Sequence, residues 1–501
     1  MVACVSGLQR NMQSKFVHEC SGNNLDDEHM SKLIVWCVQA FKKEYPLLFD
    51  RDYSVRGPKV KYEWDELLAF DYYCVYHNKR SCRKKADWLS NKDESCKYIL
   101  NNKSPGKTTI SDFKLKNPLL FLEFFQFTVD LGVRFKLIGE DVVTVDSTNI
   151  KAYANKFRTL SIVQLDYLLD LIHNLSFDST KNSKWNKLRK YFFNNKLPED
   201  LIYLVDEIYD NLNMHGINLL KTALQSRKNR DWIIDLLDKL VDNFDGVSRI
   251  NLTDMESRRM LMKDHISRYA YTIQTVRDIK TGFILSQEVT QEKNDSRAFK
   301  NAIDNTISAL GKPPRFMMAD NGYWNIKALE YSFINNIVPL IPNNNDSIKR
   351  NGTKEDKMFD SSNMMFDCVE EYFRCPFGQK LKKRSIRKMN GTLKFVFKTY
   401  KCPECPFHED CTSKKYREVF LQAHPLFLES KKNFLSEMGQ FYYKFRGVYS
   451  EGGFGTMKEG HEYPGIKRRG KQKADIDLKI EATVDNLIKI RDHLKATLIN
   501  I

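Results

Sequence analysis

The sequence predicts an α/β protein in which a mixed sheet is flanked by helices. Three patterns support this class. Residues 64–138 carry apolar side chains at helical spacing, and a second helical pattern fills 155–250. Between 254 and 342, two strand-like runs, which form a hairpin, are followed by a helix, a strand, a helix and a final strand. That order is typical of a sheet covered by helices, here split by a helical insertion.

The totals indicate a multidomain protein with an anionic partner. A chain of 501 residues is long enough for roughly two to four domains. Its 80 Lys and Arg against 64 Asp and Glu give a net charge of +16, which favours nucleic acid because basic surfaces collect phosphates. The apolar stretch PLLFLEFFQFTVDLGVRFKL carries Glu123, Asp130 and Arg134, so we interpret it as a core helix and expect no membrane association.

The N-terminal region, residues 1–138, is predicted to be helical. Ser81 is a candidate N-cap, and KSPGKTTISDFKLKN is a Pro-Gly turn followed by a basic helical segment. Short helices ending in a basic one fit a helix-turn-helix-like DNA-binding unit. An ordinary helical domain with a solvated basic face fits the pattern equally well.

Two predicted strands end on aspartate. The run GEDVVTVDST, in the segment 139–154, stops at Asp146, and RFMMAD stops at Asp320. Asn-Gly follows Asp320, so a turn role is one interpretation. The other is a binding site, because sites in open α/β sheets gather at the carboxyl ends of strands.

A third acid lies in the C-terminal block, residues 434–501. Glu451 is predicted to open a helix, with Lys458 after it and Tyr443 and Arg446 before it. Carboxylates suit Mg²⁺ or Mn²⁺, and two such ions can promote phosphodiester cleavage. A solvated charged helix is the alternative for this segment.

Four segments together resemble an insertion-sequence transposase of the DDE superfamily. They are VDSTNIKAYANKF, DMESRRMLMKD with the hairpin SRYAYTIQTVRDIKTGFILSQEVTQEKND, RFMMADNGYWNIKALEYSFINNIVPLIP, and FYYKFRGVYSEGGFGTMKEG. The last is similar to the signature Y-x2-R-x3-E-x6-K, but Tyr443, Arg446, Glu451 and Lys458 are spaced Y-x2-R-x4-E-x6-K. The departure bears on Tyr443 and Arg446 more than on Glu451.

The resemblance implies a ribonuclease H-like core with Asp146, Asp320 and Glu451 as its metal-binding triad. It implies Mg²⁺ (or Mn²⁺) as cofactor, cleavage at transposon ends, and attack of the freed 3′-hydroxyl on target DNA. Arg446 and Lys458 would hold phosphates, and Tyr443 would position a strand or stack on a base. The partners implied are DNA and a second copy of the chain, in the cytoplasm at the nucleoid.

Five of the eleven cysteines crowd between Cys368 and Cys411. An odd total with no apolar leader favours reduced thiols and a metal site. Four thiolates suit a structural Zn²⁺, and the candidate ligands are Cys375, Cys402, Cys405 and Cys411. His408 or Cys368 could replace one of them, and the thiols could equally be reduced and buried without metal. The resemblance supports a cysteine-rich, zinc-ribbon-like insert over 343–433.

The same insert carries a run of basic residues. Lys380, Lys382, Lys383, Arg384, Arg387 and Lys388 fall within nine residues, a pattern that fits either a grip on phosphates or a solvated face.

These segments define six regions: 1–138, 139–154, 155–253, 254–342, 343–433 and 434–501. The function they predict is DNA transposition, with metal-dependent cleavage at the element's ends and strand transfer. A repurposed transposase that binds DNA without cutting it is the main alternative. A nuclease that cuts but cannot join ends, and a zinc-dependent structural protein, are two more.

Overall fold

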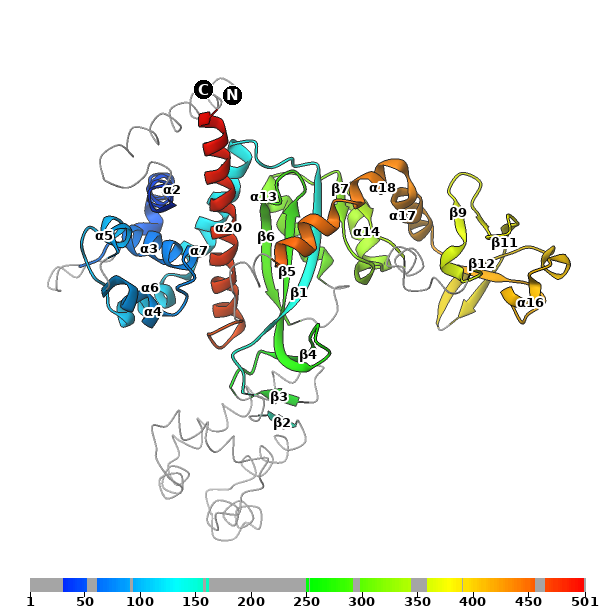
Figure 1. The fold of residues 1–501 in the computed structure, drawn as a ribbon, viewed down its shortest axis with the longest axis horizontal. Helices are drawn as coiled ribbons and strands as arrows, with labels where there is room; N and C mark the ends of the chain where they lie inside the picture. The colour runs from blue at the N-terminus through cyan, green and yellow to red at the C-terminus, as the bar shows by residue number, and fades with distance from the viewer. Residues whose placement is uncertain are drawn as a thin grey trace, which may run out of the picture.

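The computed structural model describes residues 30–51, 61–90, 93–155, 159–161, 249–251, 253–291, 298–343, 358–389, 391–455 and 465–499. In Figure 1, N-terminal helices lie on the left, a central sheet stands in the middle, and a second sheet extends to the right. The long C-terminal helix α20 (Lys471–Ile499) lies between the N-terminal helices and the central sheet. The N-terminal helices and helix α20, which are far apart in sequence, are therefore packed together.

The segment predicted to be helical between residues 64 and 138 is helical in the structure. Asn117 separates the basic helix from the apolar one, whose Pro118 occupies a first-turn position where no backbone N–H is needed. The expected core helix has one face in the main apolar core, and no helix in the described ranges is long and apolar enough to cross a bilayer. The N-terminal elements are α2 (Met30–Glu44), η1 (Pro46–Phe49), α3 (Trp64–Tyr76), α4 (Cys82–Ser90), α5 (Glu94–Ile99), α6 (Lys107–Lys116) and α7 (Pro118–Arg134).

The central sheet is mixed, as the sequence predicts. Strands β1, β7 and β8 run parallel, and β5 pairs antiparallel with β1, β6 and β4. The predicted hairpin is the β5–β6 pair. The strands are β1 (Val142–Lys151), β4 (Arg258–Leu261), β5 (Ser267–Asp278), β6 (Ile284–Thr290), β7 (Phe316–Met318) and β8 (Val338–Leu340).

The prediction that the first strand ends at Asp146 is wrong. Strand β1 continues to Lys151, because β5 offers backbone partners along that whole length, from Val143 opposite Asp278 to Lys151 opposite Ala270. Asp146 therefore lies within a strand. Asp320, in contrast, stands two residues beyond the end of β7, as the sequence predicts.

Helices connect the later strands in the predicted order. Helix α13 (Phe299–Leu310) ends at Gly311, whose φ of 69° is a conformation that glycine adopts freely, and helix α14 (Ile326–Ile334) leads into β8. The expected start of the first helix at Asp295 lies outside the described residues. So does most of the predicted helical insertion, which the short strands β2 (Thr159–Ser161) and β3 (Arg249–Asn251) frame by pairing with each other.

The second sheet has five antiparallel strands in the order β13-β12-β11-β10-β9. Its apolar side holds a small core of its own, formed by Met364, Phe373, Leu381, Phe397, Val419 and Leu421. The strands are β9 (Met365–Asp367), β10 (Tyr372–Arg374), β11 (Lys380–Met389), β12 (Thr392–Lys398) and β13 (Glu418–Gln422). Short helical turns lie at η3 (Ser361–Asn363), η4 (Cys402–Glu404) and α16 (His408–Cys411).

The C-terminal block is helical, as predicted, and covers both faces of the central sheet. Helix α20 packs on α7 and β6. On the opposite face, Phe434 and Tyr443 pack against Val142, Phe316 and Met318 of β1 and β7. The elements of this second layer are α17 (Pro425–Leu435), α18 (Glu437–Tyr443), the π-helical turn η5 (Gly447–Glu451) and α19 (Gly452–Gly455).

Buried ion pairs join the N-terminal helices to α20. Asp71 on α3 is 1% exposed and pairs with Lys85, which is 0% exposed, and with Lys114 at 2.9 Å. Lys114 also lies 3.6 Å from Asp477 on α20. Burial by itself would raise the pKa of Asp71, but the charges of Lys114 and Lys85 outweigh it and lower that pKa to about 2.

We predict that Asp71→Asn lowers the free energy of unfolding by about 3–5 kcal/mol at pH 7, because it leaves Lys85 charged and buried without its carboxylate. Since the pKa of Asp71 is lowered on folding, its contribution is present above pH 4 and is lost as the pH falls towards 2. The difference in unfolding free energy between the native chain and Asp71→Asn should therefore become smaller as the pH falls. Urea unfolding at pH 7 and at lower pH measures it.

Glu94→Gln is the matched control for that measurement, because the Glu94 side chain is 76% exposed and its pair with Lys97 contributes little. If Asp71→Asn lowers the free energy of unfolding no more than Glu94→Gln does, the buried ion pairs do not stabilise the fold.

Candidate active site

The structure brings Asp146 and Asp320 to one place on the central sheet. Their strands β1 and β7 are parallel neighbours, with Thr144 opposite Met318 at the end of the pairing. Arg446 joins the two acids: its Nη2 lies 3.3 Å from Oδ1 of Asp146 and 3.9 Å from Oδ2 of Asp320. One guanidinium thus faces two carboxylates from segments that are far apart in sequence.

Backbone N–H groups orient both acids. The N–H of Ser147 donates to Oδ1 of Asp146 at 2.9 Å. The N–H of Gly322 donates to Oδ1 of Asp320 at 2.9 Å, and Asp320 caps the short helical turn η2 (Asn321–Tyr323). The turn role that Asn-Gly suggested for Asp320 is therefore present. It coexists with the approach to Arg446, because the second carboxylate oxygen faces the guanidinium.

The segment that carries Glu451 is fixed to the sheet beside Asp146. The hydroxyl groups of Thr144 and Ser450 are 2.7 Å apart and buried, and these residues stand two before Asp146 and one before Glu451. Gly453 gives a second anchor, because a Cβ there would lie 2.6 Å from the guanidinium carbon of Arg277 on β5. A larger residue at this position would require the guanidinium of Arg277 to shift away from α19.

The extra residue between Arg446 and Glu451 falls in the π-helical turn η5. Arg446 precedes this turn and Glu451 ends it, and the N–H of Gly452 bonds the carbonyl of Gly447 five residues earlier. A π turn is a one-residue bulge in a helix. It accommodates the longer spacing between Arg446 and Glu451 without breaking the helical path.

Tyr443 does not lie on the surface. Its side chain is 4% exposed, and its hydroxyl donates to the carbonyl of Ala319 at 3.0 Å. The expectation that Tyr443 stacks on a base is wrong for this conformation, because the ring is packed against Phe434. Its contact instead fixes the residue before Asp320. Lys458, the last member of the signature, lies outside the described residues.

The donors at this site are hard oxygens arranged around one positive charge. Such carboxylates suit a divalent cation such as Mg²⁺. In this structure the positive charge that faces them is the guanidinium of Arg446. Within the described ranges, no group of three or more His, Cys, Asp or Glu side chains is already arranged to hold a metal ion. The residues present fit the cofactor in chemistry, with two acids and the Glu451 segment gathered at one place.

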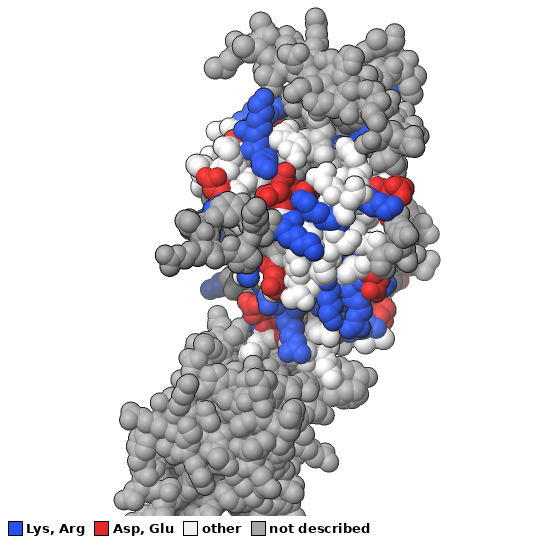
Figure 2. All heavy atoms as spheres, turned by 90° about the vertical axis from the view of Figure 1, so that its left-hand side faces the viewer, with Lys and Arg blue, Asp and Glu red and all other residues white. Residues whose placement is uncertain are grey.

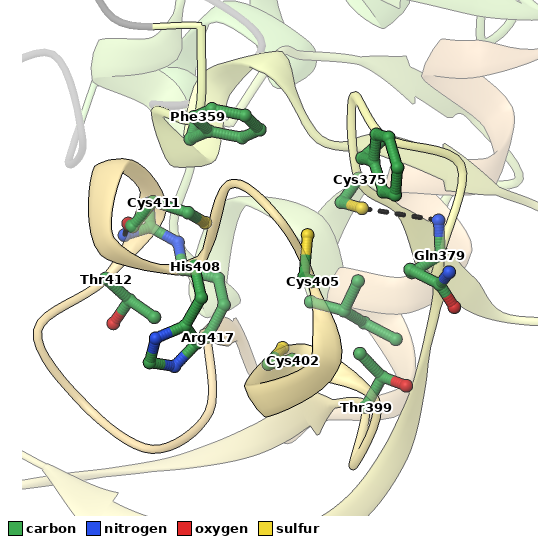
Figure 3. Close-up of a pocket in the computed structure, with 12 residues that line it drawn as sticks. Phe359, Cys375, Gln379, Thr399, Cys402, Cys405, His408, Cys411, Thr412 and Arg417 are labelled. Carbon is green, nitrogen blue, oxygen red and sulfur yellow. Dashed lines mark hydrogen bonds between the residues drawn. The ribbon is translucent and has the colours of Figure 1, made fainter.

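The cysteine-rich insert places its four candidate thiols around one pocket. Figure 3 shows Cys375, Cys402, Cys405 and Cys411 lining it together with His408. The N–H of Gln379 donates to the sulfur of Cys375 at 3.3 Å, and Gly378 at φ 81° makes that turn possible. Burial raises the pKa of Cys411, and the neighbouring thiols of Cys402, Cys375 and Cys405 add to that effect. The four thiols suit Zn²⁺ in kind and number. In the described part of the chain they are not close enough together to form a metal-binding group.

Three positioning contacts were not predicted: the Thr144–Ser450 hydroxyl pair, the Tyr443–Ala319 hydrogen bond and the approach of Gly453 to Arg277. Each joins the C-terminal block to a sheet strand or its end. No local pattern could have identified them, since each contact joins residues that are far apart in the sequence.

One comparison with known proteins covers this part of the chain. Residues 374–491 match the family model described as Transposase DDE domain. This confirms the resemblance to an insertion-sequence DDE transposase. The match includes Glu451, Arg446 and strands β11 to β13 of the cysteine-rich sheet, while Asp146 and Asp320 lie before it. No curated protein and no solved structure matches the chain. Transposase DDE domains act on DNA and generally use a divalent metal ion.

We predict that Thr144→Val and Ser450→Ala are each destabilising by about 1–3 kcal/mol, because each leaves the other buried hydroxyl without its partner. The double variant should lose less than the sum of the two, since both polar groups are then removed. A double-mutant cycle of urea unfolding measures this coupling. Strictly additive losses would show that the hydroxyl pair does not hold the Glu451 segment on β1.

Proposed function

We propose that this chain is an active DNA transposase that cleaves DNA at the ends of its element and transfers the 3′-hydroxyl to target DNA. The observation that carries the proposal is the convergence of Asp146 and Asp320 on Arg446, beside the anchored Glu451 segment. The transposase family match over residues 374–491 supports the same reaction class.

Asp146, Asp320 and Glu451 would hold the divalent metal ions, Mg²⁺ or Mn²⁺. When bound, such ions activate a water or hydroxyl and stabilise the leaving oxygen of a phosphodiester. The backbone N–H of Gly322 engages Oδ1 of Asp320 and leaves Oδ2 facing Arg446, whereas Oδ1 of Asp146 both accepts from the N–H of Ser147 and faces Arg446. The Tyr443 hydroxyl keeps the end of β7 in place by holding the carbonyl of Ala319.

Arg446 would have two roles in turn. Before DNA binds, its charge offsets the repulsion between the two aspartates. With DNA present, its planar guanidinium suits the oxygens of a phosphate, and Lys458 would supply a second positive charge. Tyr443 is excluded from direct contact with DNA by its burial.

The arrangement of the central strands supports a ribonuclease H-like core: a parallel set β1-β7-β8 continued by the antiparallel strands β5 and β6. We further propose that the N-terminal helices bind DNA and that two copies of the chain act together, since transposition joins two ends. The proposed location is the nucleoid in the cytoplasm.

We predict that the purified protein cleaves DNA carrying its element's ends in the presence of Mg²⁺ and not with chelator. Asp320→Asn should lower the cleavage rate by about a thousandfold or more, equivalent to about 4 kcal/mol of activation free energy, because one metal-binding oxygen becomes an amide. Labelled strand cleavage measures the rate, and filter binding shows whether DNA is still bound.

Glu330→Gln is the matched control for cleavage, since Glu330 is an exposed acid on α14, the helix that follows Asp320. Cleavage by the native chain and by this control, with none by Asp320→Asn, supports the transposase. Binding without cleavage by all three proteins would favour the repurposed DNA-binding protein, and cleavage without joining would favour a nuclease.

We also propose a structural Zn²⁺ held by Cys375, Cys402, Cys405 and Cys411. The four thiols line one pocket, and the N–H of Gln379 is already directed at the sulfur of Cys375. His408 lines the same pocket and is the alternative ligand there. A zinc ion would join the turn after β10 to the loop between β12 and β13.

We predict about one Zn²⁺ per chain, measured by elemental mass spectrometry after exhaustive dialysis. Cys405→Ser should remove most of it, whereas Cys82→Ser, on the N-terminal helix α4, should not. A zinc content near zero in the native chain, or equal in both variants, would contradict the proposed ligand set.

A further inference from the structure

The hairpin formed by β11 and β12 is unusually basic for a strand pair. Between residues 380 and 398 the chain has eight Lys and Arg and no Asp or Glu. The basic residues are Lys380, Lys382, Lys383, Arg384, Arg387, Lys388, Lys394 and Lys398. Residues 382–388 of β11 are all exposed, so this charge faces outward.

Like charges stand directly opposite each other in this hairpin. Lys382 pairs with Lys398, and Arg387 pairs with Lys394 across the strands. Such cross-strand pairs are destabilising in an isolated sheet. A polyanion lying along the hairpin would remove that repulsion.

Nearby carboxylates neutralise only part of the charge. Glu370 pairs with Lys380, Glu418 with Arg387, and Glu371 lies 3.9 Å from Lys383. For Lys382, Arg384, Lys388 and Lys394 there is no carboxylate partner in the part of the chain that the structure describes. These four cations are the excess charge of the hairpin.

Aromatic and apolar side chains lie among the charges. Arg384 lies 5.0 Å from the ring centre of Tyr400, and Lys383 lies 4.8 Å from that of Phe395. Towards the end of the hairpin, Ile386 and Leu393 are 58% and 56% exposed. The surface therefore combines phosphate-binding groups with apolar groups that could contact the edges of bases.

Other basic regions are less suited to a polyanion. Figure 2 shows the face formed by the N-terminal helices, where acidic side chains are interspersed with the basic ones. The pocket between these helices and α20 contains Arg80 and Arg468. Arg80 pairs with Glu481, and Arg468 pairs with Asp477. The β11–β12 hairpin has the stronger uncompensated charge.

We propose that the β11–β12 hairpin is a docking surface for duplex DNA, which binds its phosphates and directs Ile386 and Leu393 into a groove. The inference rests on the proposed transposase function and adds a contact outside its catalytic residues. Duplex DNA fits because its major groove admits a two-stranded ribbon, and apolar side chains there can contact thymine methyl groups. In Figure 1 the hairpin extends away from the central sheet, on the side opposite the N-terminal helices.

The test compares DNA binding by the full chain and a variant that has lost the excess charge: Lys382→Gln, Arg384→Gln, Lys388→Gln and Lys394→Gln. Binding to a duplex oligonucleotide is measured with chelator present, from 50 to 200 mM salt. We expect affinity to fall at least about tenfold, and the slope of log K against log salt to fall by about three to four, since four phosphate contacts are lost.

The matched control removes four exposed lysines elsewhere: Lys263→Gln, Lys300→Gln, Lys327→Gln and Lys473→Gln. A second variant keeps the hairpin's charge, with Arg384→Lys and the three lysines changed to Arg. The inference requires that both bind duplex DNA nearly as the native chain does. It also requires a larger loss on duplex than on single-stranded DNA of the same length.

An unchanged affinity and slope in the hairpin variant, or a loss equal to the control's, would overturn the inference. Weakened DNA binding by the charge-keeping variant would mean that altered folding, and not lost charge, explains the hairpin variant's lower affinity. That result would also count against the inference. Cleavage at saturating DNA separates this proposal from the catalytic one. It should be preserved in the hairpin variant, whereas Asp320→Asn should abolish it whatever the hairpin does.

Discussion

The candidate active site depends on holding like charges close together. Asp146 and Asp320 come from neighbouring parallel strands, and two carboxylates at short range repel each other unless a cation lies between them. Arg446 supplies that charge, at 3.3 Å from one acid and 3.9 Å from the other. The layer α17–α19 carries both Arg446 and Glu451 across the sheet. Its packing on β1 and β7 therefore decides whether the site exists at all.

Side-chain contacts hold the segments around the candidate active site on both faces of the sheet. On one face, Thr144 and Tyr443 join the C-terminal layer to β1 and to the end of β7. Arg277 of β5 also lies against Gly453 and pairs with Asp485 of α20 at 2.9 Å. The buried Asp71 cluster then ties α20 to the N-terminal helices. Helix α20 is therefore in contact both with the N-terminal helices and with the sheet that carries the acids.

Charge is distributed differently around the candidate active site and in the five-stranded sheet. Near Asp146 and Asp320, the positive charge of Arg446 is balanced by the two carboxylates that it contacts. In the five-stranded sheet, positive charge accumulates without matching acids, at a cost in sheet stability. This contrast fits the proposed function, in which the acids would act on a phosphodiester and the basic hairpin would hold the DNA.

The sequence by itself determined the order of strands and helices from β5 to β8, the apolar core helix, the position of Asp320 after a strand and the cluster of cysteines. These features follow from local periodicity and turn chemistry, which a short window of residues contains. It misplaced the end of β1, because the length of a strand depends on the partner that pairs with it, here β5. The stacking of Tyr443 on a base, which the resemblance implied, does not fit its burial, because burial depends on the strands against which α18 packs. The longer spacing between Arg446 and Glu451 was an irregularity in sequence and became intelligible only as a π turn. Only the tertiary structure decided which side chains meet, since the two acids, Arg446 and the hydroxyl pair are brought together by contacts between segments far apart in the chain.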